Sequence, residues 1–270
     1  MFASSLPSGE VFCYTIPVAI RLLRCGLPVA LTLAAAAAGA ARAGPPFATD
    51  DPEPTDYGHF EAYLYSQASW GGDATGTAVG LEVNYGALPD LQVSVALPVG
   101  FNASDDAGPR FGIGDAELGL KYRFIHEDCD GWMPQVGFFP SVDAALVRSS
   151  ATSSDRPIHV FLPLWAQKSF GDWTTFGGGG YRINDGNNAK DSWFIGWAAL
   201  KQISDGLRLG GEIYREAAET RGTNDTTAVG VGATYDLSDA WHVIGSTGIG
   251  IEDRTGNTAL SSYLALELTM

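Results

Sequence analysis

The sequence predicts an all-β protein, a single closed antiparallel transmembrane β-barrel of about twelve strands in up-and-down order, in a bacterial outer membrane. Three observations predict it: an export leader, segments of about ten residues that alternate apolar and polar side chains, and connections that alternate between short and long. Composition agrees, since the 270 residues include 34 Gly and 11% aromatics but only 17% charged residues. Such a balance suits many strands that are apolar on one face only.

Residues 1–43 read as a secretory signal peptide. Arg21 and Arg24 form a basic region, residues 25–40 are small and apolar, and Ala41-Arg42-Ala43 is a cleavage site, so the mature chain is expected to begin at Gly44. The alternative is a transmembrane anchor, but the apolar run is short, Ala-rich and followed by a cleavage site. No later segment is long enough to cross a bilayer as a helix.

Residues 44–57 are acidic and rich in proline, so we expect an extended segment and not a strand. It is expected either to lie in the periplasm or to fold into the barrel lumen as a small plug. Its acidic residues, Asp50, Asp51, Glu53 and Asp56, do not have the spacing of a calcium-binding loop. No metal site or cofactor is therefore predicted.

Residues 58–270 form the predicted barrel. The alternation is clear in Leu91-Gln92-Val93-Ser94-Val95-Ala96-Leu97, where every second residue is aliphatic. An even number of strands returns both ends of the barrel to the periplasmic side. The expected strands span 58–69, 75–87, 90–101, 114–125, 133–147, 157–169, 172–183, 191–202, 206–217, 226–237, 240–251 and 259–270.

Connections and aromatic residues indicate which end of the barrel faces the periplasm. Short turns such as Gly171-Asp172 and Ser204-Asp205-Gly206 belong on the periplasmic side, and the longer loops 102–113, 148–156, 184–190, 218–225 and 252–258 on the outside. Aromatic residues near the short turns predict a girdle at the periplasmic membrane interface. Trp70, Tyr181 and Trp193 are expected at the outer membrane interface. The girdle residues are Tyr85, Tyr122, Phe124, Trp132, Trp173, Tyr235 and Trp241.

If the aliphatic face of each strand meets lipid, the charged residues on the other face line the lumen, because a charged side chain is costly anywhere but in a wet interior. Twelve strands lie between the eight that close around packed side chains and the sixteen that leave an aqueous channel, so a narrow or partly blocked passage is expected. A structural network of salt bridges is as good an interpretation as a selectivity filter. The lumen-lining candidates are Glu61, Glu82, Glu117, Lys121, Arg123, Asp143, Arg182, Arg208 and Glu212.

The sequence lacks the motifs of most other functions. A net charge of −15 argues against nucleic acid. The histidines His59, His126, His159 and His242 have no zinc-site spacing, and no nucleophile elbow or phosphate-binding loop occurs, so no catalytic residue and no enzyme is predicted. Cys129 is the sole cysteine after cleavage, which leaves no intrachain disulfide.

Two short stretches resemble one protein family. Residues 46–54, Pro-Phe-Ala-Thr-Asp-Asp-Pro-Glu-Pro, precede His59-Phe60-Glu61, and residues 111–122 are similar to a glycine-rich strand that ends in Lys121-Tyr122. Both are similar to the "MetA pathway of phenol degradation" family of outer-membrane transporters. The resemblance implies a porin-like channel or transporter for small molecules, aromatic or hydrophobic ones among them.

Three alternatives stay open at this point. One is a structural outer-membrane barrel with a plugged lumen and no transport. Another is an outer-membrane acyl hydrolase that uses His159 with Ser153 or Ser154, although parity directs His159 inward. The third is a soluble periplasmic β-protein. For a barrel, the expected partners are outer-membrane lipid and lipopolysaccharide, the barrel-assembly machinery and a small-molecule solute.

Overall fold

The computed structural model describes residues 46–71, 74–104, 107–128, 131–145, 158–186, 188–251 and 260–270. The predicted signal peptide, Cys129, loop 252–258 and the 148–156 loop with Ser153 and Ser154 lie outside these ranges. Within them, no helix has the length and apolarity to cross a membrane.

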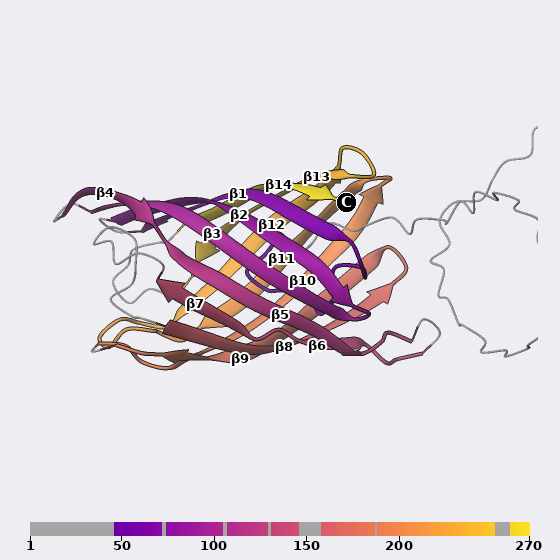
Figure 1. The fold of residues 1–270 in the computed structure, drawn as a ribbon, viewed down its shortest axis with the longest axis horizontal. Coiled ribbons are helices and arrows are strands. Elements are labelled where there is room, and N and C mark those ends of the chain that lie inside the picture. Colours follow the sequence, from indigo (N-terminus) through magenta and orange to yellow (C-terminus); the bar gives the residue numbers. More distant parts are fainter. Residues whose placement is uncertain are drawn as a thin grey trace, which may run out of the picture. The chain divides into compact units, whose positions relative to one another are not determined.

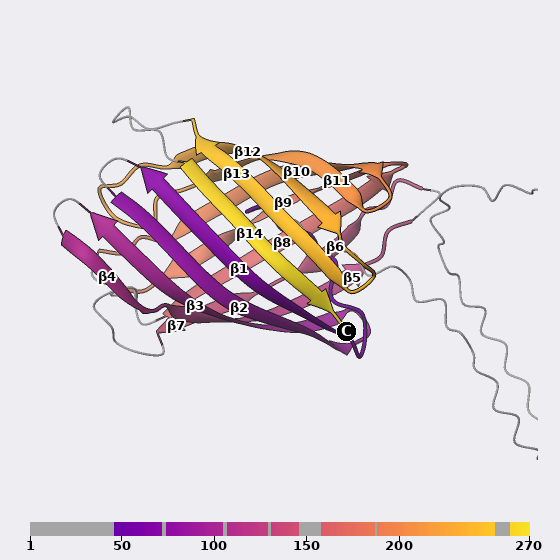
Figure 2. The ribbon, with the colours of Figure 1, turned by 90° about the horizontal axis from the view of Figure 1, so that it is seen from above.

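The described part of the chain forms a closed antiparallel β-barrel without helices (Figures 1 and 2). Each strand pairs with its neighbours in the chain, and β1 pairs with β14 to close the barrel. The strands are β1 (Phe60–Gly71), β2 (Ala74–Leu88), β3 (Leu91–Ser104), β4 (Ala107–Ile113), β5 (Asp115–Ile125), β6 (Gln135–Phe138), β7 (Ser141–Ala145), β8 (Ile158–Phe170), β9 (Trp173–Asn184), β10 (Ser192–Ser204), β11 (Leu207–Glu216), β12 (Thr226–Asp236), β13 (Trp241–Gly250) and β14 (Leu260–Thr269).

Two of the barrel's strands are each interrupted once, so the fourteen segments make twelve barrel strands and the predicted fold is confirmed. β4 and β5 are halves of one strand that breaks at Gly114, and both halves pair with β3. β6 and β7 are halves of another that breaks at Phe139-Pro140, and both pair with β8. The sequence predicted one strand over 133–147. Pro140 has no N–H to donate to the ladder, which explains the break.

The predicted loop over 102–113 is wrong. β3 continues to Ser104, and β4 begins at Ala107 and pairs with it through partners such as Phe101 with Phe111. The turn residues of this stretch favoured a loop on local grounds. Pairing between β3 and β4 satisfies the backbone N–H and C=O groups of both strands, and this gain overrides the local preference for a loop.

The alternation of side chains follows the two faces of the wall. In β10, Phe194, Gly196 and Ala198 are buried, whereas Ile195 and Trp197 are 56% and 60% exposed. The buried parity faces the lumen, because a Cβ added to Gly196 would meet Thr49, which lies inside the barrel. Large apolar side chains therefore cover the outer face of the wall, as a lipid environment requires.

Both ends of the barrel domain meet at the end that carries the short turns. Phe60 N donates to Met270 O at 2.9 Å, and Met270 N donates to Phe60 O at 2.8 Å. Short turns identify this end as periplasmic. The seven predicted girdle residues are all exposed large side chains, and Phe60 stacks on Tyr85 with ring centroids 4.4 Å apart. Trp70, Tyr181 and Trp193 are exposed as well.

The glycine run of β9, Gly177–Gly180, lets two neighbouring strands approach closely. A Cβ added to Gly178 would lie 2.0 Å from the backbone oxygen of Leu164 on β8, and one added to Gly179 would lie 2.3 Å from the backbone oxygen of Phe194 on β10. Those oxygens belong to the ladder and are not free to move, so this part of the wall depends on glycine.

We therefore expect Gly178→Ala to destabilise the barrel by about 1–3 kcal/mol or more, as overpacking does in close-packed cores. The measurement is the temperature at which the folded, heat-modifiable band is lost on a gel. Gly245→Ala is the matched control, because a Cβ there would meet its nearest heavy atoms at an ordinary 3.5 Å. Equal melting of the two variants would contradict the prediction.

Candidate functional site in the barrel lumen

Residues 46–57, here called the inner segment, lie inside the periplasmic half of the barrel. Thr49 is fully buried, and Pro46 and Pro52 are among the largest fully buried side chains. Room for them comes from inward-facing glycines, since a Cβ at Gly137 would meet Pro52 at 3.0 Å and one at Gly232 would meet Phe47 at 2.7 Å. The segment therefore contacts strands on several sides of the barrel.

Polar contacts hold the inner segment to opposite parts of the wall. The backbone N–H groups of Ala48 and Thr49 donate to the Glu212 carboxylate at 3.2 and 3.1 Å, and the Thr49 hydroxyl donates to it at 3.1 Å. On β3, Gln92 Oε1 accepts from the Thr55 N–H at 2.7 Å and from its hydroxyl at 3.0 Å. The Gln92 contacts satisfy polar atoms of Thr55 that would otherwise be buried without partners.

Lys121 joins the inner segment to β5 by charge. Its Nζ lies 3.1 Å from Asp50 Oδ1 and 3.5 Å from Asp51 Oδ1, and its side chain is only 7% exposed. Glu53 adds a bond from Gln167 Nε2 on β8 at 3.2 Å. Removing one partner of a buried ion pair typically costs about 3–5 kcal/mol, because the remaining charge loses its compensation.

The nine lumen-lining candidates all lie on the inward face of their strands, and their hydrogen bonds and ion pairs have several different partners. Lys121 and Glu212 hold the inner segment, as described. Arg123 lies at the periplasmic turn, where it donates to Asp90 at 2.8 Å and to Gln135 at 3.1 Å. Arg182 lies at the opposite end and pairs with Glu216 and Glu219. The four residues therefore have different partners along the wall.

Four of the other five candidates lie on the β1 to β7 side, and Arg208 lies near the start of β11. Glu61 accepts from Tyr63 at 3.0 Å, and Glu82 is the cross-strand partner of Tyr63. Glu117 and Asp143 are directly opposite each other on β5 and β7, while Arg208 is opposite Thr234 on β12. A role of any of the nine in solute passage stays a prediction.

An aromatic wall on β8 to β11 faces this acidic side. Phe161, Trp165 and Tyr214 surround Phe194, with ring centroids 6.4, 6.0 and 5.5 Å from its ring. The Arg182 guanidinium lies 4.7 Å from the centroid of Phe161, which closes the cluster at its outer end. Only charged residues were used to predict the lumen lining, so this wall was missed. The alternation of inward and outward side chains, applied to the aromatic residues, would have indicated it.

Phe176 on β9 continues the aromatic wall to the inner segment. It is 3% exposed and lies 6.4 Å from the ring of Phe47. Packed aromatic rings therefore line the inner face of the wall from the Arg182 end to the inner segment, with carboxyl groups on the opposite side. Offset and edge-to-face contacts between such rings contribute about 0.5–1.5 kcal/mol per pair.

A scan against family models matches residues 60–268 to the family described as "Putative MetA-pathway of phenol degradation". The chain belongs to this family. The predicted resemblance is confirmed, and family and fold together place the MetA-pathway family member in the bacterial outer membrane. No curated protein matches the sequence.

Solved structures share the fold of this family member. An outer membrane channel from Pseudomonas putida F1 has a TM-score of 0.71 at 15% identity and covers 82% of this chain and 98% of its own. The translocator domain of the autotransporter NalP from Neisseria meningitidis has 0.55 at 11%, covering 79% and 90%. The KdgM porin has 0.51 at 9%, covering 76% and 98%. At these identities the likeness concerns the fold.

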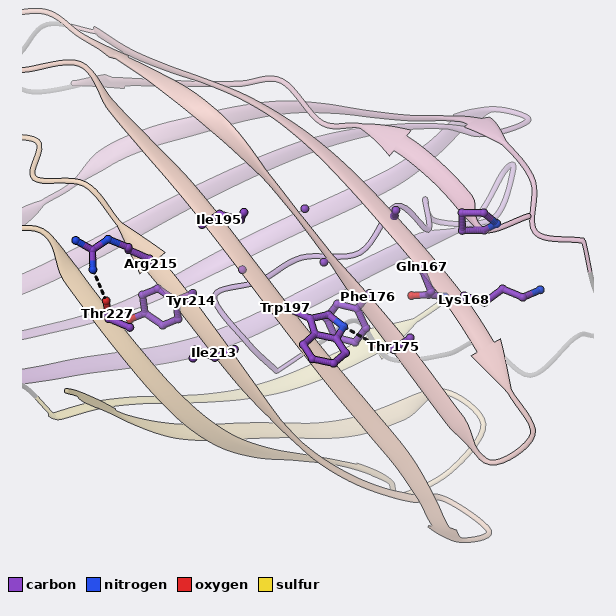
Figure 3. A pocket seen from close by; sticks show the side chains of 15 residues that line it. Gln167, Lys168, Thr175, Phe176, Ile195, Trp197, Ile213, Tyr214, Arg215 and Thr227 are labelled. Atoms are coloured by element: carbon purple, nitrogen blue, oxygen red, sulfur yellow. Dashed lines mark hydrogen bonds between the residues drawn. The ribbon is translucent and has the colours of Figure 1, made fainter. Parts of the chain in front are cut away.

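A groove of about 600 Å³ on the family member's wall faces the membrane and not the lumen (Figure 3). Outward-facing Ile195, Trp197 and Ile213 border it, and Trp197 Nε1 donates to Thr175 Oγ1 at 2.6 Å. Gly177, Gly178 and Gly196 also line it. The ladders of β9 with β8 and β10 continue beneath it, so the groove does not open into the lumen.

The geometry around His159 does not suit a lipid-cleaving site of this family member. His159 faces inward opposite Asp143, and its Nδ1 lies 2.7 Å from Asn184 Oδ1. A hydrolase that acts on membrane lipid needs its histidine on the outward face. Among the residues that the structure describes, no group of three or more His, Cys, Asp or Glu side chains is arranged to hold a metal ion.

Proposed function

We propose that this protein is an outer-membrane channel for small aromatic or other apolar molecules and that the inner segment gates it. The observation that carries the proposal is the aromatic wall, which faces the lumen directly beyond the inner segment. The description of the family, with its reference to phenol degradation, and the fold shared with outer-membrane channels and porins support it. The proposal includes three further partners. Outer-membrane lipid and lipopolysaccharide surround the barrel, and the barrel-assembly machinery folds it.

The test is current through single barrels in a planar bilayer, with and without a neutral aromatic alcohol. We expect conductance steps that benzyl alcohol blocks at lower concentration than a non-aromatic polyol of similar size. Phe194→Ala should weaken the block about three- to ten-fold, the equivalent of one lost ring contact. Ile195→Ala is the matched control, because Ile195 is next to Phe194 in the chain but its side chain points to the membrane.

A second candidate is a structural barrel that stays sealed. It is favoured by the contacts of the inner segment with several sides of the wall. Folded protein that gives no current steps under any of these conditions would support the sealed barrel and overturn the channel. Equal block in the Phe194 and Ile195 variants would leave a channel but remove the aromatic wall from its function.

A further inference from the structure

Directly paired inward-facing residues form a row that runs around the barrel wall from one end to the other. Its periplasmic part begins with Asp236, at the end of β12, which pairs with His242 on β13. His242 is opposite Glu267 on β14, and Glu267 is opposite Tyr63 on β1. Each step crosses one strand, so the row follows the direction of the hydrogen bonds.

The row continues through the acidic side of the lumen. Tyr63 pairs with Glu82, and Ala96 on β3 separates Glu82 from Glu117. Glu117 is opposite Asp143, which is opposite His159 near the start of β8. Because barrel strands tilt against the axis, a row along the hydrogen bonds climbs as it turns. It therefore leads from a periplasmic turn at Asp236 to the outer end at His159.

The ion pairs of three lumen cations lie outside this row, although Lys121 also acts electrostatically on Glu82 and Arg182 on Asp143. Lys121 pairs with Asp50 and Asp51 of the inner segment, and Arg123 pairs with Asp90 at the periplasmic turn. Arg182 pairs with Glu216 and Glu219, while Arg208 acts on Glu267 from β11. The row therefore has more carboxyl groups than cations along its middle, at Glu82, Glu117 and Asp143, and in their ionised form these groups attract cations and repel anions.

Unsatisfied polar atoms on the same side point independently to a donor ligand. Glu267 Oε2, His242 Nε2 and Asn84 Oδ1 are buried and have no hydrogen-bond partner within the described part of the chain, and their residues are 0%, 1% and 5% exposed. Asn84 Oδ1 can only accept, and so can Glu267 Oε2 when its carboxyl is ionised. A buried acceptor without a donor is costly, and a solute that carries N–H groups removes that cost.

The geometry points to a row that serves as a path for positively charged groups, so that the channel prefers cations and admits aromatic amines more readily than aromatic carboxylates. The inference rests on the proposed channel and names its solute class more closely. An arylalkylammonium can place its ring on the Phe161, Trp165 and Phe194 side while its ammonium reaches the carboxylates opposite. A carboxylate of the same shape would meet like charge.

The first measurement is the reversal potential of single barrels in a KCl gradient. We expect a preference for K⁺ over Cl⁻, which falls about three-fold on Glu117→Gln, the effect of one charge at about 7 Å in water. Asp205→Asn, in the β10–β11 turn, removes an equal charge outside the lumen and should leave the preference unchanged. Variants are compared after gel migration shows that they fold.

The second measurement is block by two matched probes, phenethylammonium and 3-phenylpropionate. We expect the ammonium to block at a concentration about ten-fold lower, as two carboxylates each contributing about three-fold imply. Anion preference, or equal block by both probes, in a conducting barrel would overturn the inference and leave the channel standing. A folded barrel that stays silent both as the full chain and without residues 46–54 would overturn both.

Discussion

Deletion of residues 46–54 should raise the single-channel conductance several-fold, because these residues fill the periplasmic half of the lumen. The deletion removes the contacts with Glu212, Lys121 and Gln167 but keeps Thr55, which bonds to Gln92, and the start of β1. The lumen of a twelve-stranded barrel is too wide for the side chains of the wall to fill, so removal of the inner segment leaves open space. The measurement is the step size in planar bilayers at fixed salt.

A second variant separates the volume of the segment from its contacts. Replacing residues 46–54 with nine Gly and Ser residues keeps the length and removes the ion pair, the hydrogen bonds and the buried prolines. We expect it to conduct nearly as well as the deletion, because a flexible chain does not stay ordered in the lumen. Conductance unchanged from the full chain in both variants would show that the inner segment does not close the passage.

Acidification should close the channel. Burial of its carboxylate raises the pKa of Asp51 to about 7, against the opposing effect of the Lys121 ammonium. A raised pKa means that the inserted segment binds a proton more readily than the released one. Lowering the pH from about 7 towards the ordinary value near 4 therefore favours insertion, by at most about ten-fold per pH unit for one proton. Above about pH 7 both states are ionised and the effect ends.

Conductance recorded between pH 8 and pH 4 tests this dependence. Asp51→Asn imitates the protonated form, so it should conduct weakly throughout and respond little to pH. Asp50 stays available to pair with Lys121 in this variant, which keeps the cation compensated. Conductance that rises on acidification, or an Asp51→Asn barrel that keeps the full pH response, would assign the titration to another group.

The strands could be predicted because each carries its own pattern. The stretch 172–183 was expected and β9 spans Trp173–Asn184, and the expected 226–237 became β12 at Thr226–Asp236. Alternation is a local property that needs no knowledge of neighbouring strands. The extension through β4 could not be read in this way, since it depends on pairing between β3 and β4 across turn-forming residues.

The site was predictable only in part, for a related reason. Parity gives the direction of each side chain, so charged residues such as Glu117 and Lys121 could be placed inward from sequence. Which of them meet depends on barrel closure and on the path of the inner segment. The bond between Thr49 and Glu212 joins residues 163 positions apart, and no spacing in the sequence signals it.

The inner segment is covalently continuous with β1, and this turns its binding into an intramolecular event. Tyr57 and Gly58 tie its end to Gly86 on β2, with Gly58 N donating to Gly86 O at 2.8 Å. A short tether of this kind gives an effective concentration on the order of millimolar. In the proposed gated channel, a solute that displaces the segment competes with that concentration, so we expect opening only at high solute concentration or with tight solute binding.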